Sequence, residues 1–553
     1  MGHTVICGRW GKPAAVSFGL AALVACGAGP RGAEPGVLRV TEREQSASFV
    51  RNFNPLLVAG DVRWPAQHAM YEPLMIHNAL AERYEPWLAT GYEWGEDLRS
   101  IRFDIRPDVR WSDGEAFSGD DVVFTFELMR DNPALDSRAV WEIIESVKVD
   151  GNAVVMDLRR PFVPGLSMLA QQSIVPEHIW SEVDDPVAFT NPEPVGTGPF
   201  TEVTRFSTQA YRVDRNPHYW QGQPGVTALE FFAFAANDQA NLALVRGELD
   251  WAGYFVPAID RTFVGRDPEH HEYWFPLLGG TVMLYTNTQK TPWDDVNVRK
   301  ALSMAIDREL VVRIAMHGTT RPADPTGLSD AFSSMRIEPS GEDWTRHDPE
   351  AAAALLDAAG LTLDDDGLRR GPDGEPLEIT LGVPAGFSDW VRATQVIARG
   401  LREVGLTVKV EANDLTAWYE RLQKGEFDLS MGWTDAWPEP YGFYRALMST
   451  ETVRPLGDSA ADNWHRFGSS EADVALKVLE ESIDPAQRKA AYETLQKIFV
   501  EQAPAIPLFL GPLWSEYNTT RFTGFPTAED PYAPGSPNLY PQTLMVLTRL
   551  EPR

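Results

Sequence analysis

Cysteine is nearly absent from this sequence of 553 residues. Cys7 and Cys26 are the only two cysteines, and both lie close to the N-terminus. The rest of the chain therefore has no residue for an intrachain disulfide, a cysteine-ligated zinc site or a thiol nucleophile. Stability and function in that part of the chain have to come from other side chains.

The sequence patterns of common enzyme classes are missing as well. It contains no HExxH, no GxSxG and no phosphate-binding loop of the GxxxxGK[ST] type. The ten histidines are scattered, and His270 and His271, followed by Glu272, form the only cluster. Because adjacent residues of a strand point to opposite faces, we expect this pair at the surface. The sequence thus predicts no enzyme, no cofactor and no metal site.

Positive charge is scarce relative to negative charge. The 49 Lys and Arg residues stand against 79 Asp and Glu residues, which gives a formal net charge of −30. Nucleic acid and anionic membrane surfaces repel such a chain. Neither is expected as a binding partner.

The first 36 residues look like an export signal followed by a lipid anchor. Arg9 and Lys12 precede the apolar run Ala14–Ala25, whose length of about a dozen residues suits a signal peptide and is too short to span a bilayer. The run ends in LVAC, which resembles a bacterial lipobox with Cys26 as the lipidated residue. We expect residues 1–25 to be a signal peptide and the Gly/Pro-rich residues 26–36 to be a flexible tether. The protein is then exported and held at a membrane surface by lipid.

Strands and helices alternate along the rest of the chain. Ile101–Ile105 has the period-two pattern of a strand, and Ser118 is placed to cap a helix with acids in its first turn. Val298–Leu310 has apolar residues at helical spacing, and Asp389–Glu403 is expected to be a long helix before another strand. The length of the chain predicts about two to four structural units. The pattern is typical of an α/β fold.

Several segments resemble the family-5 extracellular solute-binding proteins, which capture dipeptides, oligopeptides, nickel or oligosaccharides for ATP-binding-cassette (ABC) importers. They occur in the order of that family across nearly the whole mature chain. The segments are YEPLMIHN (Tyr71–Asn78), the block that begins LATGYEW and ends VVFTFELM (Leu88–Met129), VGTGPF (Val195–Phe200), NVRKALSMAIDRELVV (Asn297–Val312) and EQAPAIPLFLGPLW (Glu501–Trp514).

The resemblance implies a two-lobed α/β flytrap fold with an additional region inserted in the first lobe. Lobe I would comprise residues 37–75, 196–286 and 508–553, the insert 76–195 and lobe II 287–507. The protein would be a monomer that closes on its ligand without chemistry and delivers it to a permease and ATPase.

The segment MGWTDAWPEP (Met431–Pro440) bears on the kind of ligand. In peptide binders of the family a motif resembling G-W-x-A-D-Y-x-x-P holds the peptide amine with its aspartate. Here Ala436 takes that place, Asp435 comes one position early, and Trp437 stands at the tyrosine position. A one-residue shift in an extended segment turns a side chain to the opposite face. The segment therefore departs from the pattern of amine capture.

Two other segments favour sugar. GFSDW (Gly386–Trp390) and RFTGFPTAEDPYAPGSP (Arg521–Pro537) resemble segments of the family's binders of β-linked oligosaccharides, and sugar rings stack on tryptophan. The predicted stacking residues are Trp64, Trp251, Trp390, Trp433 and Trp437, and the predicted polar contacts are Asn54, Asp389, Asp435 and Glu439.

Each of these predictions has a structural alternative. Trp251 and Trp433 are also suited to a core, Trp64 to filling its own loop, and Asp389 to capping its helix. Three functions stay open at this point. They are an importer subunit for cello-, xylo- or manno-type oligosaccharides, the same subunit for oligopeptides, and a membrane-tethered sensor without a permease.

Overall fold

The computed structural model describes residues 34–41, 48–57, 69–338, 343–371, 374–434 and 437–553. Pro35–Arg553 forms one compact unit, to which all the elements below belong. Cys26, Trp64 and Asp435 lie outside the described residues. Across the described part of the chain, no helix combines the length and the apolar character needed to cross a membrane.

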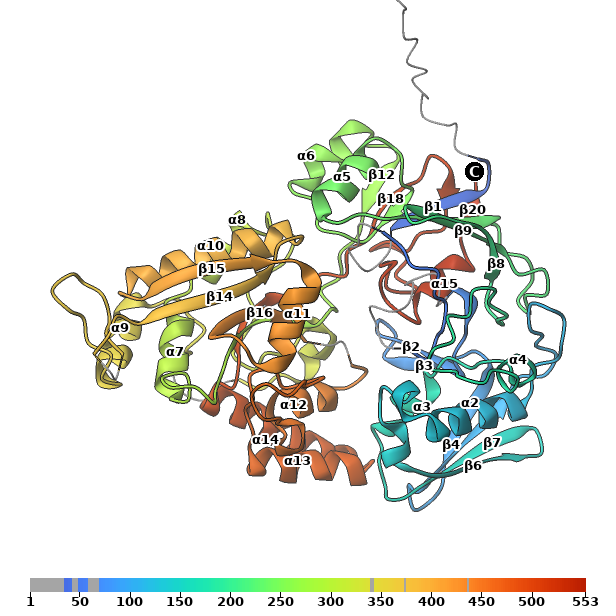
Figure 1. The fold of residues 1–553 in the computed structure, drawn as a ribbon, viewed down its shortest axis with the longest axis horizontal. Helices are drawn as coiled ribbons and strands as arrows, with labels where there is room; N and C mark the ends of the chain where they lie inside the picture. Colours follow the sequence, from blue (N-terminus) through green and yellow to red (C-terminus); the bar gives the residue numbers. More distant parts are fainter. Residues whose placement is uncertain (1–33, 42–47, 58–68, 339–342, 372–373, 435–436) are drawn as a thin grey trace, which may run out of the picture. The chain divides into compact units, whose positions relative to one another are not determined.

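The first sheet draws strands from three separate parts of the chain (Figure 1). β1 pairs in parallel with β10, residue for residue, and also with β11, whereas the other pairings in this sheet are antiparallel. In spatial order, its strands within the described residues are β12 (His271–Tyr273), β18 (Glu516–Asn518), β11 (Trp251–Ala252), β1 (Val37–Thr41), β10 (Ala228–Phe232), β9 (Ala210–Arg215) and β8 (Phe200–Phe206).

The first sheet belongs to the first lobe, and the second sheet forms the centre of the second lobe. β14, β15 and β16 are mutually parallel, and β13 runs antiparallel to β16 and β17. All residues of β13 and β17 are buried, as expected of strands that are covered on both faces. In spatial order, its strands within the described residues are β15 (Thr407–Asn413), β14 (Glu378–Pro384), β16 (Leu429–Trp433), β13 (Thr281–Thr286) and β17 (Ile506–Leu510).

This sheet begins and ends outside the boundaries expected from the sequence. Lobe II was expected to span 287–507, whereas its sheet includes Thr281–Thr286 and extends to Leu510. The two connections to the first lobe therefore run through Gly279–Gly280 and Gly511. There the Gly279 N–H donates to the Gly511 carbonyl at 3.1 Å, and the Gly511 N–H donates to the Gly280 carbonyl at 3.0 Å.

A third, antiparallel sheet lies inside the predicted insert. Its order is β4 (Ala89–Trp94), β5 (Ser100–Ile105), β7 (Ala153–Leu158) and β6 (Ile144–Asp150). Ile101, Phe103 and Ile105 are buried at period two, which confirms the predicted strand. Ser118 caps α2 (Gly119–Asp131) in a capping box with Asp121, also as predicted.

The remaining short strands and helices of the first lobe and the insert connect these sheets. They are β2 (Met75–Asn78), β3 (Arg83–Pro86), α3 (Gly165–Ala170), α4 (Glu177–Trp180), α5 (Asn237–Val245), α6 (Ile259–Thr262), β19 (Phe522–Thr523), α15 (Thr543–Leu547) and β20 (Glu551–Pro552).

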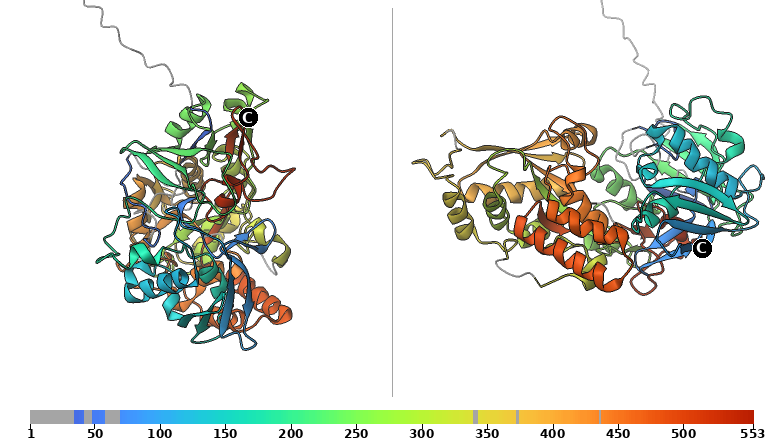
Figure 2. Two further views of the ribbon diagram at one scale, coloured as in Figure 1. Left: turned by 90° about the vertical axis from the view of Figure 1, so that its right-hand side faces the viewer. Right: turned by 90° about the horizontal axis from the view of Figure 1, so that it is seen from below.

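Helices surround the second sheet, and the view from below in Figure 2 shows them apart from the blue and green strands of the first lobe. On α10, Trp390, Ala393, Ile397 and Leu401 recur at helical spacing and are buried. The helices are α7 (Val296–Met304), α8 (Arg308–Ile314), α9 (Pro349–Ala358), α10 (Ser388–Glu403), α11 (Leu415–Lys424), α12 (Pro440–Met448), α13 (Ser470–Glu481) and α14 (Pro485–Gln502).

The prediction of one continuous helix over Val298–Leu310 was wrong. The segment divides into α7 and α8, and Asp307 begins the second helix by accepting the Leu310 N–H at 2.8 Å. Arg308 holds the break in place, since its buried guanidinium donates to the carbonyls of Thr345 at 2.7 Å and Pro507 at 2.7 Å. These partners lie far away in the sequence, so periodicity alone did not reveal the break.

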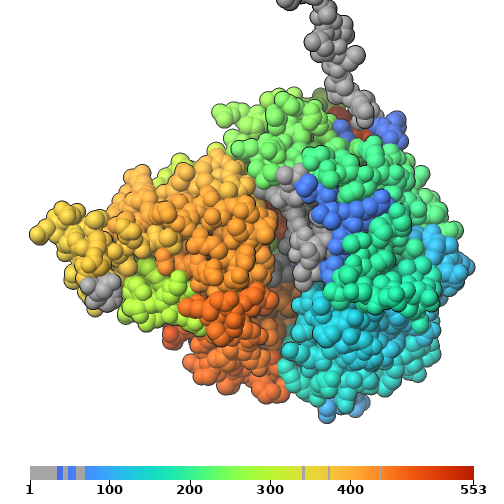
Figure 3. All heavy atoms as spheres, in the orientation of Figure 1, coloured from blue at the N-terminus to red at the C-terminus, as the bar shows by residue number. Residues whose placement is uncertain are grey.

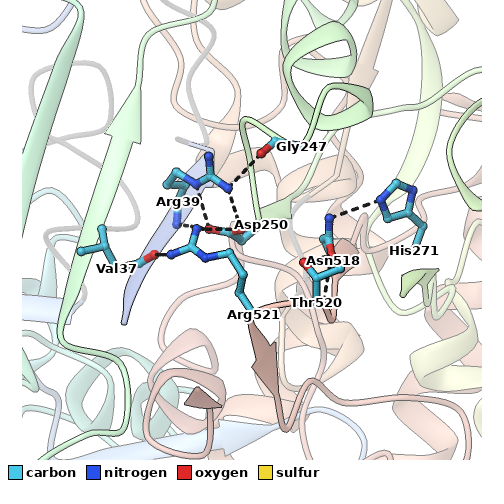
Figure 4. A network of polar contacts seen from close by, with 8 residues as sticks. All are labelled: Val37, Arg39, Gly247, Asp250, His271, Asn518, Thr520 and Arg521. Carbon is cyan, nitrogen blue, oxygen red and sulfur yellow. Dashed lines mark hydrogen bonds and ion pairs between the residues drawn. The ribbon is translucent and has the colours of Figure 1, made fainter. Parts of the chain in front are cut away.

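The expected surface position of the histidine pair was also wrong for His271. Its side chain is buried, because its ring stacks on Phe263 with centroids 4.2 Å apart. His271 Nε2 and Asn518 Nδ2 are 3.2 Å apart (Figure 4). His271 therefore belongs to the packing of the first lobe.

A buried carboxylate joins the three chain segments of the first sheet (Figure 4). Asp250 is fully buried and forms ion pairs of 3.0 Å with both Arg39 and Arg521. Arg39 also donates to the Gly247 carbonyl at 2.9 Å, and Arg521 donates to the Val37 carbonyl. The carboxylate of Asp250 thus holds together β1, the turn before β11 and the C-terminal segment.

Replacing this charge is expected to destabilise the first lobe. Asp250→Asn leaves two partly buried guanidinium groups without their counter-charge, and we expect the free energy of unfolding to fall by about 3 kcal/mol. Chemical denaturation measures the change. Asp150→Asn is the matched control, because Asp150 pairs with Arg102 at the exposed surface and should cost only about 0.5 kcal/mol. Equal losses in the two variants would contradict the role of Asp250.

Candidate ligand-binding site

The parallel strands of both sheets end toward loops that carry polar and aromatic residues. In open α/β sheets, ligands bind beside the carboxyl ends of the strands. In the second sheet Pro384 pairs with Asn413 at that end, and β16 ends at Trp433. In the first sheet, β10 is followed by the helix that begins at Asn237. These two sheet edges are the starting point for the site.

A direct contact joins the two edges. The Asn237 N–H donates to the Gly386 carbonyl at 3.3 Å, and Asn237 Nδ2 donates to Asp389 Oδ1 at 3.3 Å. Asn237 belongs to the first lobe, whereas Gly386 and Asp389 follow β14 in the second. In Figure 3 the orange surface of the second lobe faces the blue and green surface of the first. The candidate site lies between these edges.

Asp389 is the buried acid of this contact. It lies in the first turn of α10, and only 5% of its surface is exposed. Burial raises its pKa from 3.8 to about 6, against the hydrogen bonds to backbone N–H groups and the charge of Arg392, which lower it. Asp389 therefore changes its charge between mildly acidic and neutral pH at a junction between the lobes.

A cluster of five aromatic rings stands at the carboxyl end of β16. Trp433 is half-buried, and its ring centroid lies 6.0 Å from Trp390, 5.3 Å from Trp418, 6.0 Å from Tyr419 and 6.0 Å from Trp464. Tyr419 is stacked on it with an interplanar angle of 14°. Contacts on several sides prevent this indole from turning freely.

The predicted residues Trp390 and Trp433 are thus brought together, and the first is buried behind the second. The sequence reasoning missed Trp418, Tyr419 and Trp464, which complete the cluster. Trp418 is held by its Nε1, which donates to Ser430 Oγ at 3.1 Å. The only signal was the high tryptophan content, because these residues lie on different elements that meet only in the fold.

Trp437 lines a small cavity beside the cluster. The free volume of this cavity is about 10 Å³, which is room for one water molecule. The lining residues come from the connection between the lobes (278–281), from a loop before α9 (329–332) and from the segment that leads into α12 (434–443). The lining residues are Leu278, Gly280, Thr281, Ser329, Ala331, Phe332, Thr434, Trp437 and Phe443.

Glu439 places a negative charge next to the insert. It precedes α12, and its side chain is 45% exposed. It pairs with Arg488 and accepts the Tyr492 hydroxyl at 3.2 Å. Burial, and then the charge of Glu439, raise the pKa of Tyr92 on β4. The charge of the predicted acid therefore acts on a residue of the insert.

Asn54 and Trp251 are occupied by the protein itself. Asn54 is fully buried, and its Nδ2 donates to the carbonyls of Pro186 at 3.0 Å and Phe189 at 2.9 Å. Trp251 is equally buried, and its Nε1 donates to the Gly535 carbonyl at 3.0 Å. These bonds favour structural roles for both, and a contact with ligand stays a prediction. The predictions for Trp64 and Asp435 concern residues outside the described part of the chain.

The insert forms a second contact with lobe II, which the sequence reasoning also missed. The Val163 N–H donates to the Glu480 carbonyl at 2.9 Å, and Arg160 forms an ion pair with the Glu480 carboxylate. Phe162 packs edge-on against Tyr441 with centroids 5.9 Å apart, and the Tyr441 hydroxyl donates to Glu480 Oε1 at 2.7 Å. Contacts between the lobes therefore form at two separate places.

The described residues form no candidate metal site. Among the described residues, no group of three or more His, Cys, Asp or Glu side chains is arranged to hold an ion.

Comparison with known proteins identifies related sequences and folds. Residues 83–454 match the family described as bacterial extracellular solute-binding proteins, family 5 middle. The nickel-binding periplasmic protein of Escherichia coli K12 is 26% identical over 463 residues, which cover 80% of this chain and 84% of that protein. The di/tripeptide-binding protein 2 of Pseudomonas aeruginosa UCBPP-PA14 is 27% identical over 478 residues, which cover 80% and 84%.

A solved structure is similar over almost the whole fold. It is the mannohexaose-bound periplasmic oligopeptide-binding protein of an oligopeptide ABC transporter from Thermotoga maritima. The TM-score is 0.81 at 25% sequence identity, with 94% of this chain and 99% of that chain covered. The architecture of two lobes with an insert is therefore that of known solute-binding proteins.

The raised pKa of Asp389 leads to a pH-dependent difference in stability. Between about pH 4 and pH 6 the folded protein keeps a proton that the unfolded chain has released, so the cost of burying the charge is absent below this window and complete above it. We expect Asp389→Asn to stabilise the protein by at most about 3 kcal/mol at pH 7.5. For a chain of this size that raises the melting temperature by at most about 3 °C. The gain should vanish toward pH 4. A difference from wild type that stays constant over this range would contradict the expectation.

Proposed function

Because this chain belongs to the bacterial extracellular solute-binding proteins of family 5, we propose that it is the ligand-capture subunit of an ABC importer and that its ligand is a β-linked oligosaccharide. Proteins of this family bind and deliver solutes, and they do not transform them. The substrate class is the part that rests on the geometry of this particular site.

The aromatic cluster around Trp433 carries the proposal. A pyranose ring presents an apolar C–H face, which stacks on an indole, while its hydroxyls need hydrogen-bond partners. Trp433 is half-buried among four other rings, so its orientation is set before ligand arrives, which lowers the entropic cost of binding. The similar Thermotoga maritima protein is bound to mannohexaose, which supports the same ligand class.

Acids at the edge of the cluster suit the hydroxyls of a sugar. Asp389 accepts a hydrogen bond from Asn237 of the first lobe, and the charge of Glu439 acts on Tyr92 of the insert. A ligand between the lobes would satisfy such acceptors and would add contacts to both edges. Ligand that touches both lobes shifts the population toward the closed form, in which the Asn237–Asp389 and Val163–Glu480 contacts exist.

An oligopeptide is the second candidate ligand. The Pseudomonas aeruginosa relative is named as a di/tripeptide-binding protein, and it matches as large a share of this chain as the nickel-binding relative. In that case the acids of the segment 431–440 would hold the peptide amine, and the aromatic cluster would receive apolar side chains.

We further propose that the protein is a lipoprotein, lipidated on Cys26 after removal of residues 1–25. The support is the short apolar run that ends in LVAC, followed by the Gly/Pro-rich segment before β1. The tether would keep the capture protein beside its permease and so raise its local concentration there.

A ligand screen tests the substrate class. We expect cello-, xylo- or manno-oligosaccharides to raise the melting temperature of the purified protein, and tri- to pentapeptides to leave it unchanged. Trp433→Ala should weaken the oligosaccharide about tenfold, or roughly 1.4 kcal/mol. Trp141→Ala is the control, because Trp141 is a half-buried tryptophan of the insert that packs on Arg130. Stabilisation by peptides alone would overturn the sugar assignment.

Membrane association tests the anchor. In cells that express the full chain, the protein should fractionate with membranes, and Cys26→Ser should release it or leave its signal peptide uncleaved, because the acylated sulfur is lost. Cys7→Ser is the matched control and should change nothing. Metabolic labelling with a clickable fatty acid gives the direct readout. Label on the Cys26→Ser protein equal to wild type would rule out this anchor.

A further inference from the structure

Gly442 occupies a position in α12 that is costly for glycine. It is the third residue of the helix, where glycine is among the least favourable residues. Its backbone does not need glycine, since its φ is not in the positive range. The reason for a missing side chain at this position must therefore lie in what surrounds it.

The indole of Trp437 fills the place of that side chain. A Cβ added to Gly442 would lie 2.0 Å from Trp437 Cδ2, 2.3 Å from Cε2 and 2.3 Å from Cγ. Cδ2 is bonded to three ring atoms in the plane of the indole, so a neighbour that is nearest to Cδ2 approaches over the face of the ring. The backbone of α12 at Gly442 therefore lies against one face of Trp437.

The same indole is half-buried and lines the small cavity beside the aromatic cluster. Pro438 and Pro440 restrict the backbone that connects it to the helix, because each fixes its own φ. Because one face lies against the helix, a flat group of a ligand has to stack on the opposite face. A larger residue at position 442 would displace the indole from the helix.

We propose that Gly442 is a positioning residue, the seat that holds Trp437 flat on α12 so that the opposite face of the indole stacks on one ring of the ligand. This inference rests on the proposed function, because it assigns one pyranose unit of the oligosaccharide to Trp437. Gly442 itself touches no ligand, and it acts by positioning the indole.

A double-mutant cycle with mannohexaose as the probe tests the seat. Calorimetry on wild type, Gly442→Ala, Trp437→Ala and the double variant gives four dissociation constants. We expect Gly442→Ala to weaken binding at least tenfold when Trp437 is present, and by less than twofold in the Trp437→Ala background. Equal losses in both backgrounds would overturn the seat.

Thermal unfolding of the same four proteins gives a reading without ligand. Gly442→Ala should lower the melting temperature of wild type through the clash with the indole, and should raise it in the Trp437→Ala background, where alanine is the better helix former. If Gly442→Ala alone fails to fold, the double variant should fold. Absence of this rescue would contradict the proposal.

Different results would contradict the sugar assignment and the role of Gly442. If wild type binds a tripeptide to pentapeptide and not mannohexaose, the sugar assignment is wrong, and the cycle is measured with that peptide. If wild type binds oligosaccharide and the cycle is additive, the proposed function stands and the seat is wrong. If neither probe binds, the melting temperatures alone test the role of Gly442. Gly442→Ala should lower the melting temperature when Trp437 is present and raise it in the Trp437→Ala background.

Discussion

The two connections between the lobes meet where no side chain fits, and the rest of the structure depends on this constraint. Gly279, Gly280 and Gly511 share two backbone hydrogen bonds, and a Cβ on Gly280 would lie 1.5 Å from the Thr434 carbonyl oxygen. The connections therefore run as a tight pair beside the segment that carries Trp437. A change of angle between the lobes has to pass through this narrow place, next to the candidate site.

Polar contacts join the lobes at two places in the described part of the chain. Asn237 meets Asp389 near the aromatic cluster, and the insert meets Glu480 through Arg160 and Val163. Both contacts contain directional hydrogen bonds, and the second adds the edge-on packing of Phe162 on Tyr441. Water can replace hydrogen bonds and ion pairs of this kind, as the proposed opening and closing of the lobes requires.

Much of the fold followed from local patterns. The strand at Ile101–Ile105, the cap at Ser118 and the helix from Asp389 to Glu403 depend on residues within one turn or one strand. The failures come from contacts made outside the segment itself. The break between α7 and α8 depends on distant partners such as Pro507, and the burial of His271 depends on Phe263 and Asn518. Spacing within a segment carries no information about them.

The sequence by itself determined the family resemblance, the α/β class and the segments from which a site is built. It also showed that no cysteine follows Cys26. Only the tertiary structure decided how the tryptophans divide. Trp251 and Trp433 both follow patterns of a strand end, yet the first is enclosed and the second keeps part of its surface open. The physical reason is that exposure is a property of the surroundings. Trp251 is enclosed by the C-terminal segment at Gly535, whereas the rings around Trp433 come from α10, α11 and the loop at Trp464.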